Sequence, residues 1–202
     1  TEERRLVKID RVPKLLVDGL QGVEDRNFQN HIGIDPMGVA RAIYVNIREV
    51  GFEQGASTLT QQLVRSLFLS NTKTITRKVK EALYALIIEA RFDKQTILEA
   101  YLNQVYLGQV GDQSIHGIAA GSDFWFGRDV ADLQPQEIAL LIGLVQGPYY
   151  WDPRKHPERA QKRRTTVLNE FLEAGLLTPE QTAEAKQAPL GVKSRRALPH
   201  LF

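Results

Sequence analysis

The sequence predicts an all-α fold, and three observations support this prediction. Most of the apolar segments begin at a proline or at a capping residue, which is typical of helix N-termini. Within these segments the apolar residues recur three and four positions apart, as in an amphipathic helix. Sustained alternation of apolar and polar residues is absent, and so is an Asn-Gly hairpin turn. A length of 202 residues fits one domain, or one domain with a small lobe.

The helices follow from these signals in chain order. Pro13 opens the first helix, which ends near Glu24, and Asp35-Pro36 caps the second. Thr58 begins the sequence TLTQ, a capping box that starts the third helix. The fourth helix is apolar almost all round between residues 82 and 88, so we expect it to be central. The expected helices are 13–24, 35–50, 58–69, 76–92, 93–105, 114–126, 135–146, 157–174 and 179–187, with loops near 26–35, 51–57, 70–75 and 107–113.

Composition and charge restrict the class of protein. The chain is 43% apolar and 25% charged with a net charge of +2, so no strong overall field points to nucleic acid. Cations cluster in residues 77–80, 154–164 and 193–196, either as solvated faces or as sites for an anionic partner. The absence of cysteine excludes disulfides, thiol catalysis and thiolate metal sites, and the four histidines lack metal-ligand spacing. The apolar runs 82–88 and 138–145 are too short to cross a bilayer, which takes about 20 residues.

Two acidic residues stand together where the first helix ends. Glu24 and Asp25 are followed closely by Phe28 and His31. Paired acids are common at solvated helix ends, and a carboxylate at the end of an apolar helix is also suited to general base catalysis. His31 fits a structural hydrogen-bonding residue better than a metal ligand or a base.

A second group of polar residues surrounds the third and fourth helices. Ser57, Thr58, Gln61 and Gln62 lie at a helix start, where plain N-capping and phosphate binding are alternative interpretations. In the next helix, Arg77 and Lys78 share a face with Glu81, either as a surface ion pair or as a cation site for a diphosphate. Farther along, Asn103 and Tyr106 could line a groove, although spacing alone does not establish it.

Taken together, these stretches resemble one family, the peptidoglycan glycosyltransferase domain of class A penicillin-binding proteins. The ordered motifs of this family appear here as EDRNFQNHIG, GASTLTQQ, RKVKE, KQTILEAYLNQVYLG and RRTTVL. The resemblance is closest to the bifunctional 1B type. It implies a lysozyme-like helical domain over 1–190, with a small membrane-associated jaw lobe at about 34–75. Residues 191–202 would begin a linker to a transpeptidase domain outside this chain.

The resemblance also implies a reaction and the residues that perform it. Lipid II units would be joined into β-1,4-linked glycan strands with release of undecaprenyl diphosphate. By matching motif positions, Glu24 falls on the general base and Glu81 on the second catalytic carboxylate. The positions around the lipid diphosphate are Thr58, Gln62, Arg65, Arg77 and Lys78. Two residues depart from the family pattern, because lysine is often found at the positions of Arg65 and Gln146.

Elementary chemistry agrees with this assignment. A sugar hydroxyl is too weakly acidic to ionise at neutral pH, so a carboxylate must take its proton as the new bond forms. A diphosphate leaving group needs positive charge rather than a proton donor, which the cations near Glu81 provide. A divalent cation, Mg²⁺ or Mn²⁺, could also serve, although no cofactor is implied with certainty.

The sequence leaves two other functions open. A lysozyme-like hydrolase and a non-catalytic module that binds wall precursors are the alternatives. The segment 37–52 has an apolar stripe that suits either an interfacial or a core-packed helix. The expected partners are lipid II, the growing glycan strand, the membrane surface and the transpeptidase domain of the same chain, with no nucleic acid. The expected location is the periplasmic face of the bacterial inner membrane, with a transmembrane anchor outside this sequence.

Overall fold

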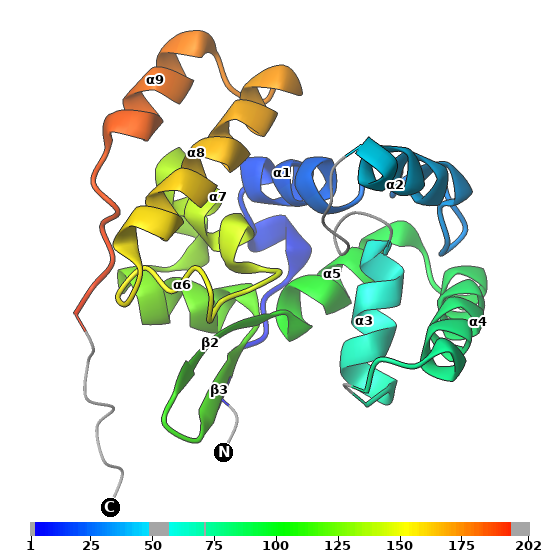
Figure 1. Cartoon of the computed structure of the whole chain (residues 1–202). Helices are drawn as coiled ribbons and strands as arrows, with labels where there is room; N and C mark the ends of the chain where they lie inside the picture. The colour runs from blue at the N-terminus through cyan, green and yellow to red at the C-terminus, as the bar shows by residue number, and fades with distance from the viewer. Residues whose placement is uncertain (1–2, 49–56, 71, 195–202) are drawn as a thin grey trace, which may run out of the picture.

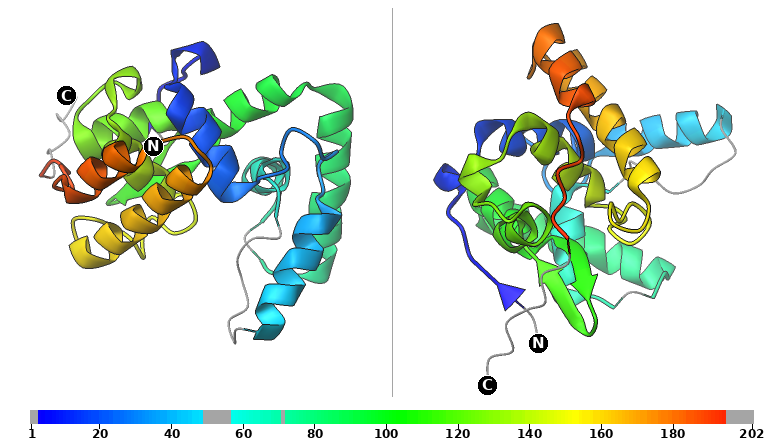
Figure 2. Two further views of the ribbon diagram at one scale, coloured as in Figure 1. Left: turned by 90° about the horizontal axis from the view of Figure 1, so that it is seen from above. Right: turned by 90° about the vertical axis from the view of Figure 1, so that its left-hand side faces the viewer.

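The structure, a computed structural model, describes residues 3–48, 57–70 and 72–194, and it is predominantly helical as predicted. Helices α2, α3 and α4 lie on one side of the molecule and α6, α7, α8 and α9 on the other, with α1 and α5 between them (Figures 1 and 2). The helices are α1 (Lys14–Glu24), α2 (Pro36–Arg48), α3 (Leu59–Phe68), α4 (Ile75–Arg91), α5 (Lys94–Gln104), α6 (Ile118–Phe126), α7 (Pro135–Leu144), α8 (Pro157–Glu173) and α9 (Pro179–Gln187), with short 3₁₀ turns at Ile9–Arg11 and Val130–Asp132.

Helix α7 is the centre of the core. Every residue from Glu137 to Leu144 is buried, and α7 packs against α1, α8, α6 and α9. Its N-terminus is fixed by Pro135 in the first turn and by Glu137, which accepts the backbone N–H of Gln134 at 2.9 Å. Because α7 supports α1, it also fixes the end of α1, where Glu24 lies.

The expectation that helix 76–92 is central is wrong. Only Glu81 and Ala85 are buried in α4, whereas Leu83 is 54% exposed and Ile87 is 49% exposed. Helix α4 covers α3 with one face and turns an apolar face outward. The prediction failed because an all-round apolar sequence does not distinguish a helix that is surrounded by protein from one whose apolar face points outward.

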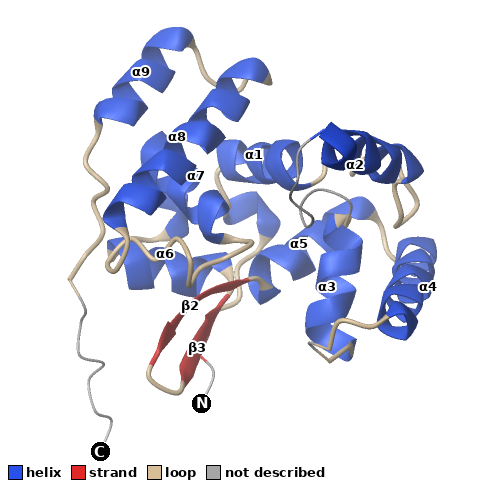
Figure 3. Ribbon diagram, in the orientation of Figure 1, coloured by secondary structure: helices blue, strands red, loops and turns tan. Residues whose placement is uncertain are grey.

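A small sheet lies at one end of the molecule, where the sequence predicted a loop and a helix start (Figure 3). Strands β2 (Tyr106–Val110) and β3 (Gln113–His116) form an antiparallel hairpin, and β1 (Glu3–Arg4) pairs in parallel with β3. The turn is Gly111-Asp112, with Gly111 at φ 55°, which is a hairpin signal of the Gly-Asp type rather than Asn-Gly. Helix α6 therefore begins at Ile118, four residues later than predicted.

The predicted jaw lobe, residues 34–75, takes in α2 and α3. Residues 49–56, 71 and 195–202 lie outside the described part of the chain, and with them part of the predicted 37–52 stripe and most of the predicted linker. Within the described ranges, none of the helices combines the length and apolar character that a membrane span requires.

Candidate active site

Glu24 is the last residue of α1 and is half-buried between three other elements. The Nε2 of Gln146, just beyond α7, donates to Glu24 Oε2 at 2.6 Å. Burial raises the pKa of Glu24, and the opposing effects of hydrogen bonding to Gln146, the charge of Arg163 and hydrogen bonding to Gln62 do not cancel it. A carboxylate with a raised pKa is a stronger base than a free one, which agrees with the predicted role.

Gln62 links Glu24 to the second part of the site. Its Oε1 accepts the hydroxyl of Tyr101 at 3.0 Å, which leaves the amide N–H groups of Gln62 free to donate. These N–H groups lie between Glu24 and the carbonyl of Ser57, which is 3.4 Å away. The two adjacent glutamines of the second motif therefore have different roles. Gln62 faces the site, and Gln61 completes the capping box with Thr58.

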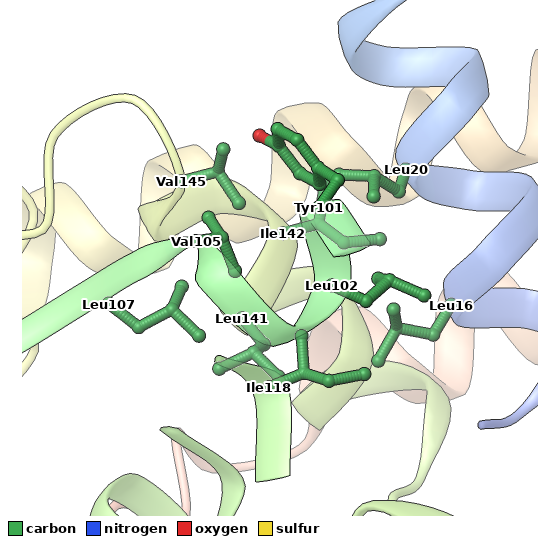
Figure 4. Close-up of a pocket in the computed structure, with 10 residues that line it drawn as sticks. All are labelled: Leu16, Leu20, Tyr101, Leu102, Val105, Leu107, Ile118, Leu141, Ile142 and Val145. Carbon is green, nitrogen blue, oxygen red and sulfur yellow. The ribbon is translucent and has the colours of Figure 1, made fainter. Parts of the chain in front are cut away.

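Tyr101 connects this site to the core. It belongs to ten side chains that surround a small apolar space between α1, α5 and α7, with its oxygen at the edge of the group (Figure 4). Burial and the charge of Glu24 raise the pKa of Tyr101 well above its ordinary value, so its hydroxyl stays protonated and donates to Gln62. The space is core packing beneath the site rather than a substrate pocket.

Glu81 is completely buried and is held by two cations. The guanidinium of Arg65 donates to both of its oxygens at 3.0 and 2.9 Å, and Lys78 Nζ donates to Oε1 at 3.0 Å. Burial alone would raise the pKa of Glu81, but the hydrogen bonds from Arg65 and Lys78 outweigh it, and the net effect lowers the pKa. Glu81 is therefore a permanent anion that fixes the two cations in place.

The cations also share Ser57, which joins the two halves of the site. Lys78 Nζ donates to Ser57 Oγ at 2.8 Å, and Arg65 contacts the same oxygen at 3.3 Å. A continuous path thus runs from Gln146 through Glu24, Gln62 and Ser57 to the cations around Glu81. Arg77 lies in the first turn of α4, the helix that carries Lys78 and Glu81, and its Nε is a buried nitrogen with no hydrogen-bond partner. A buried donor without a partner is unusual in a folded protein and makes Arg77 a candidate for the site.

Asp25 and His31 support the site from behind. His31 Nδ1 accepts the N–H of Gly33 at 3.0 Å, so Nε2 carries the proton and donates to Asp25 Oδ2 at 2.6 Å. The same Asp25 oxygen accepts the N–H of Leu59 at 3.0 Å, and Thr58 Oγ1 donates to the Gly33 carbonyl at 2.6 Å. These bonds hold the start of α3 against the loop that follows α1.

Phe28, a candidate site residue because it follows the acidic pair, is 0% exposed and packs edge-on against His31. Its ring is therefore closed to substrate and packs within the loop behind Glu24. Lys94 lies over the Phe28 ring at 4.6 Å, donates to the His31 carbonyl at 2.7 Å and contacts Glu89 at 2.8 Å. The sequence analysis did not predict this ion pair, because Lys94 and Glu89 lie on different helices and only Lys94 belongs to one of the motifs.

Asn103 and Tyr106 engage other parts of the chain. The Asn103 amide accepts the N–H of Val7 at 2.8 Å and donates to the Val7 carbonyl at 2.9 Å, which fastens the N-terminal segment to α5. Tyr106 is in β2 and its hydroxyl donates to Gln109 at 3.0 Å. Neither bond involves the groups around Glu24 or Glu81. Arg163 lies close enough to Glu24 to lower its pKa. The sequence indicated Arg163 only as the first residue of the fifth motif.

The described residues contain no group of three His, Asp or Glu side chains that could hold a metal ion. Arg65 and Lys78 already occupy both oxygens of Glu81. The side chains around Glu81 therefore fit an anionic ligand better than a resident divalent cation.

Comparison with known proteins identifies the family of the chain. A model of the family described as Transglycosylase matches residues 1–172. Penicillin-binding protein 1B of Haemophilus influenzae is 46% identical over 194 residues, covering 96% of this chain and 25% of that protein. Penicillin-binding protein 1A of Aquifex aeolicus is 46% identical over 192 residues, covering 95% of this chain and 26% of that protein. Penicillin-binding protein 1B of Escherichia coli is 43% identical over 194 residues, covering 96% and 23%.

The fold is similar to a crystal structure of penicillin-binding protein 1A from Haemophilus influenzae, with a TM-score of 0.59 and 20% identity, covering 96% of this chain and 19% of that one. The chain spans about a quarter of the length of the curated relatives it matches. The chain therefore belongs to the transglycosylase family and is a glycosyltransferase domain of the kind found in penicillin-binding proteins 1A and 1B.

Proposed function

We propose that this domain polymerises lipid II into β-1,4-linked glycan strands and releases undecaprenyl diphosphate by an inverting displacement. The observation that supports this most directly is the contrast between the two carboxylates. Glu24 lies among neutral donors with a raised pKa, whereas Glu81 is fixed by two cations with a lowered pKa. Carboxylates whose environments drive their pKa values apart divide the acid–base and electrostatic roles between them.

Glu24 acts as the general base on the acceptor sugar. Its carboxylate accepts the hydroxyl proton while the hydroxyl oxygen forms a bond to C1 of the donor sugar. The bond from C1 to the diphosphate oxygen breaks on the opposite face, and its electron pair leaves with the diphosphate. A single displacement of this kind converts the α-linked donor into a β-linked product.

The cations near Glu81 stabilise the departing diphosphate. Arg65 and Lys78 are held at fixed positions by Glu81 and Ser57, so they need no reorganisation as negative charge develops. Arg77 adds a donor that makes no hydrogen bond within the protein. Glu81 therefore acts by fixing the cations. A divalent cation would act on the diphosphate oxygens rather than on Glu81, and activity measured with and without a chelator tests this requirement.

An exposed apolar stripe on α4 supports contact with the membrane that carries the lipid substrate. Ile75, Val79, Leu83 and Ile87 recur every four residues and are 85%, 53%, 54% and 49% exposed. Phe68 and Tyr84 extend the surface, with ring centroids 6.3 Å apart. An exposed patch of this size marks a membrane or protein contact. We place the domain at the periplasmic face of the inner membrane, beside a transpeptidase domain of the same protein.

The test is a gel of the products formed from labelled lipid II. Glu24→Gln keeps the shape and one acceptor of the side chain but removes the base, so we expect polymer to disappear while lipid II still binds. A variant that polymerises normally would overturn the base assignment. Isolated glycan strands provide the second assay: shortening by the unaltered protein would indicate a hydrolase. If the unaltered protein bound lipid II but formed no polymer, the chain would be a binding module.

A further inference from the structure

A neutral side chain holds the proposed base at the open edge of the site. Gln146 is exposed, and it reaches Glu24 Oε2 from the solvent side at 2.6 Å. The two residues are 122 positions apart, and the packing of α1 against α7 brings them together. By sequence alone, Gln146 is only a departure from the pattern of the family that the chain resembles. The structure gives it a bond to the general base instead.

An amide and a cation affect a carboxylate differently. Both can fix the position of one oxygen, but only a cation adds positive charge, and an opposite charge within about 4–6 Å lowers a carboxyl pKa by about 1–3 units. The resemblance to the family leads us to expect lysine at this position, so lysine is the informative comparison. The hydrogen bond from Gln146 already lowers the pKa of Glu24. A lysine here would add a positive charge to that bond and lower the pKa of Glu24 further, which would weaken it as a base.

Other side chains that face Glu24 also affect its pKa. Arg163 on α8 is the cation that lowers the pKa of Glu24, and its guanidinium also lies 4.7 Å from the ring centroid of Trp151. Asp25 and Glu170 are like charges near Glu24. The facing side chains from α3 and α5 are Gln62 and Tyr101, both neutral.

We propose that Gln146 is a positioning residue for Glu24, holding its carboxylate in place by an uncharged hydrogen bond instead of an ion pair. The inference rests on the proposed role of Glu24 as general base. Its consequence is kinetic: the acid limb of the pH profile of kcat/KM, which reports ionisation of the base in the free enzyme, lies at higher pH than it would with lysine at position 146.

The test compares pH profiles of lipid II polymerisation for the unaltered protein, Gln146→Lys, Gln146→Ala and Gln187→Lys. We expect Gln146→Lys to move the acid limb down by about one pH unit or more. Gln187 is exposed on α9, so Gln187→Lys adds the same charge elsewhere and leaves the limb in place. Gln146→Ala loses a hydrogen bond to a charged group, so we expect kcat to fall about tenfold while KM stays within about twofold.

An acid limb that does not move in Gln146→Lys, or a full kcat in Gln146→Ala, would overturn the inference. Thermal unfolding of each variant shows whether lost activity is lost fold. Glu24→Gln separates the two proposals. If Glu24→Gln polymerises lipid II, the base assignment fails. If Glu24→Gln is inactive and the Gln146→Lys profile is unchanged, only the role of Gln146 fails.

Discussion

Glu24 and Glu81 have the same side chain and opposite surroundings. Glu24 has an uncharged donor and a partly open face, and burial raises its pKa. Glu81 is buried, but its two cations outweigh the effect of burial and lower its pKa. The surroundings of Glu24 make it a stronger base, and the surroundings of Glu81 keep two cations at fixed positions. A base and fixed positive charge are the two requirements of sugar transfer from a diphosphate donor.

The raised pKa of Glu24 has a consequence for stability. Because the folded pKa exceeds the unfolded one, the folded state binds the proton more tightly, and stability falls as pH rises through the range between them. We therefore expect Glu24→Gln to increase the free energy of unfolding at neutral pH, with the gain disappearing as pH falls below the ordinary pKa of 4.5. Urea unfolding at a series of pH values measures this.

Glu81→Gln is the matched comparison for that experiment. The pKa of Glu81 is lower in the folded state than in the unfolded state. The ionised form of Glu81 therefore stabilises the fold at pH values above the unfolded pKa, and this contribution is lost as the pH falls through the folded pKa. Glu81→Gln should therefore destabilise the protein at neutral pH by about 1–3 kcal/mol, since it weakens charge-assisted hydrogen bonds to Arg65 and Lys78, which are themselves partly exposed. A Glu24→Gln gain that stays constant at all pH values would show that ionisation of Glu24 is not its cause.

At the scale of elements, the loop between α1 and α2 is fixed to two helices at once. Asp25 accepts the first N–H of α3, and the Gly33 carbonyl accepts the hydroxyl of Thr58, the N-cap of α3. Gly33 also lies against α4 with φ 113°, a conformation that other residues rarely adopt. The capping box at Thr58 was predictable because its partners lie within four residues. The role of Asp25 was not, since Leu59 is 34 positions away.

Gly33→Ala tests how firmly this loop must be placed. A Cβ at Gly33 would lie 2.7 Å from the carbonyl oxygen of Ala85, a backbone atom that cannot move aside cheaply. Strain and overpacking together should cost about 2–4 kcal/mol in urea unfolding, and the loss of Glu24 alignment should reduce polymerisation. The control is Gly22→Ala in α1, where nothing lies within 4 Å and a gain of about 0.5–1 kcal/mol is expected. Equal effects would show that the close approach to α4 is unimportant.

Over the whole molecule, helix positions were predictable and helix neighbours were not. Thr58 and Pro135 fixed helix starts through local chemistry, and α3, α4 and α7 begin within one residue of the expected positions. The placement of α4 could not be inferred, because periodicity cannot distinguish an apolar face in a core from one directed outward. The motifs located Glu24 and Glu81 on α1 and α4, but only the structure shows that Gln62 and Ser57 connect them.

The apolar stripe of α4 predicts membrane binding by the domain itself. Replacing Leu83 and Ile87 by glutamate should reduce co-sedimentation with lipid vesicles at least tenfold, because each buried apolar side chain contributes about 1.5–3 kcal/mol. Both residues are exposed, so the free energy of unfolding should change by less than about 1 kcal/mol. Gln161→Glu with Asn169→Glu on exposed positions of α8 adds the same charge away from the stripe. Equal vesicle binding by both double variants would argue against contact through α4.

The same stripe bears on how the domain behaves in the test tube. Exposed apolar patches in aqueous solution tend to pack against those of other copies, which leads to aggregation. A mild detergent above its micelle concentration should therefore change the elution volume on a sizing column and improve recovery during purification. The Leu83 and Ile87 glutamate variant should need little of it.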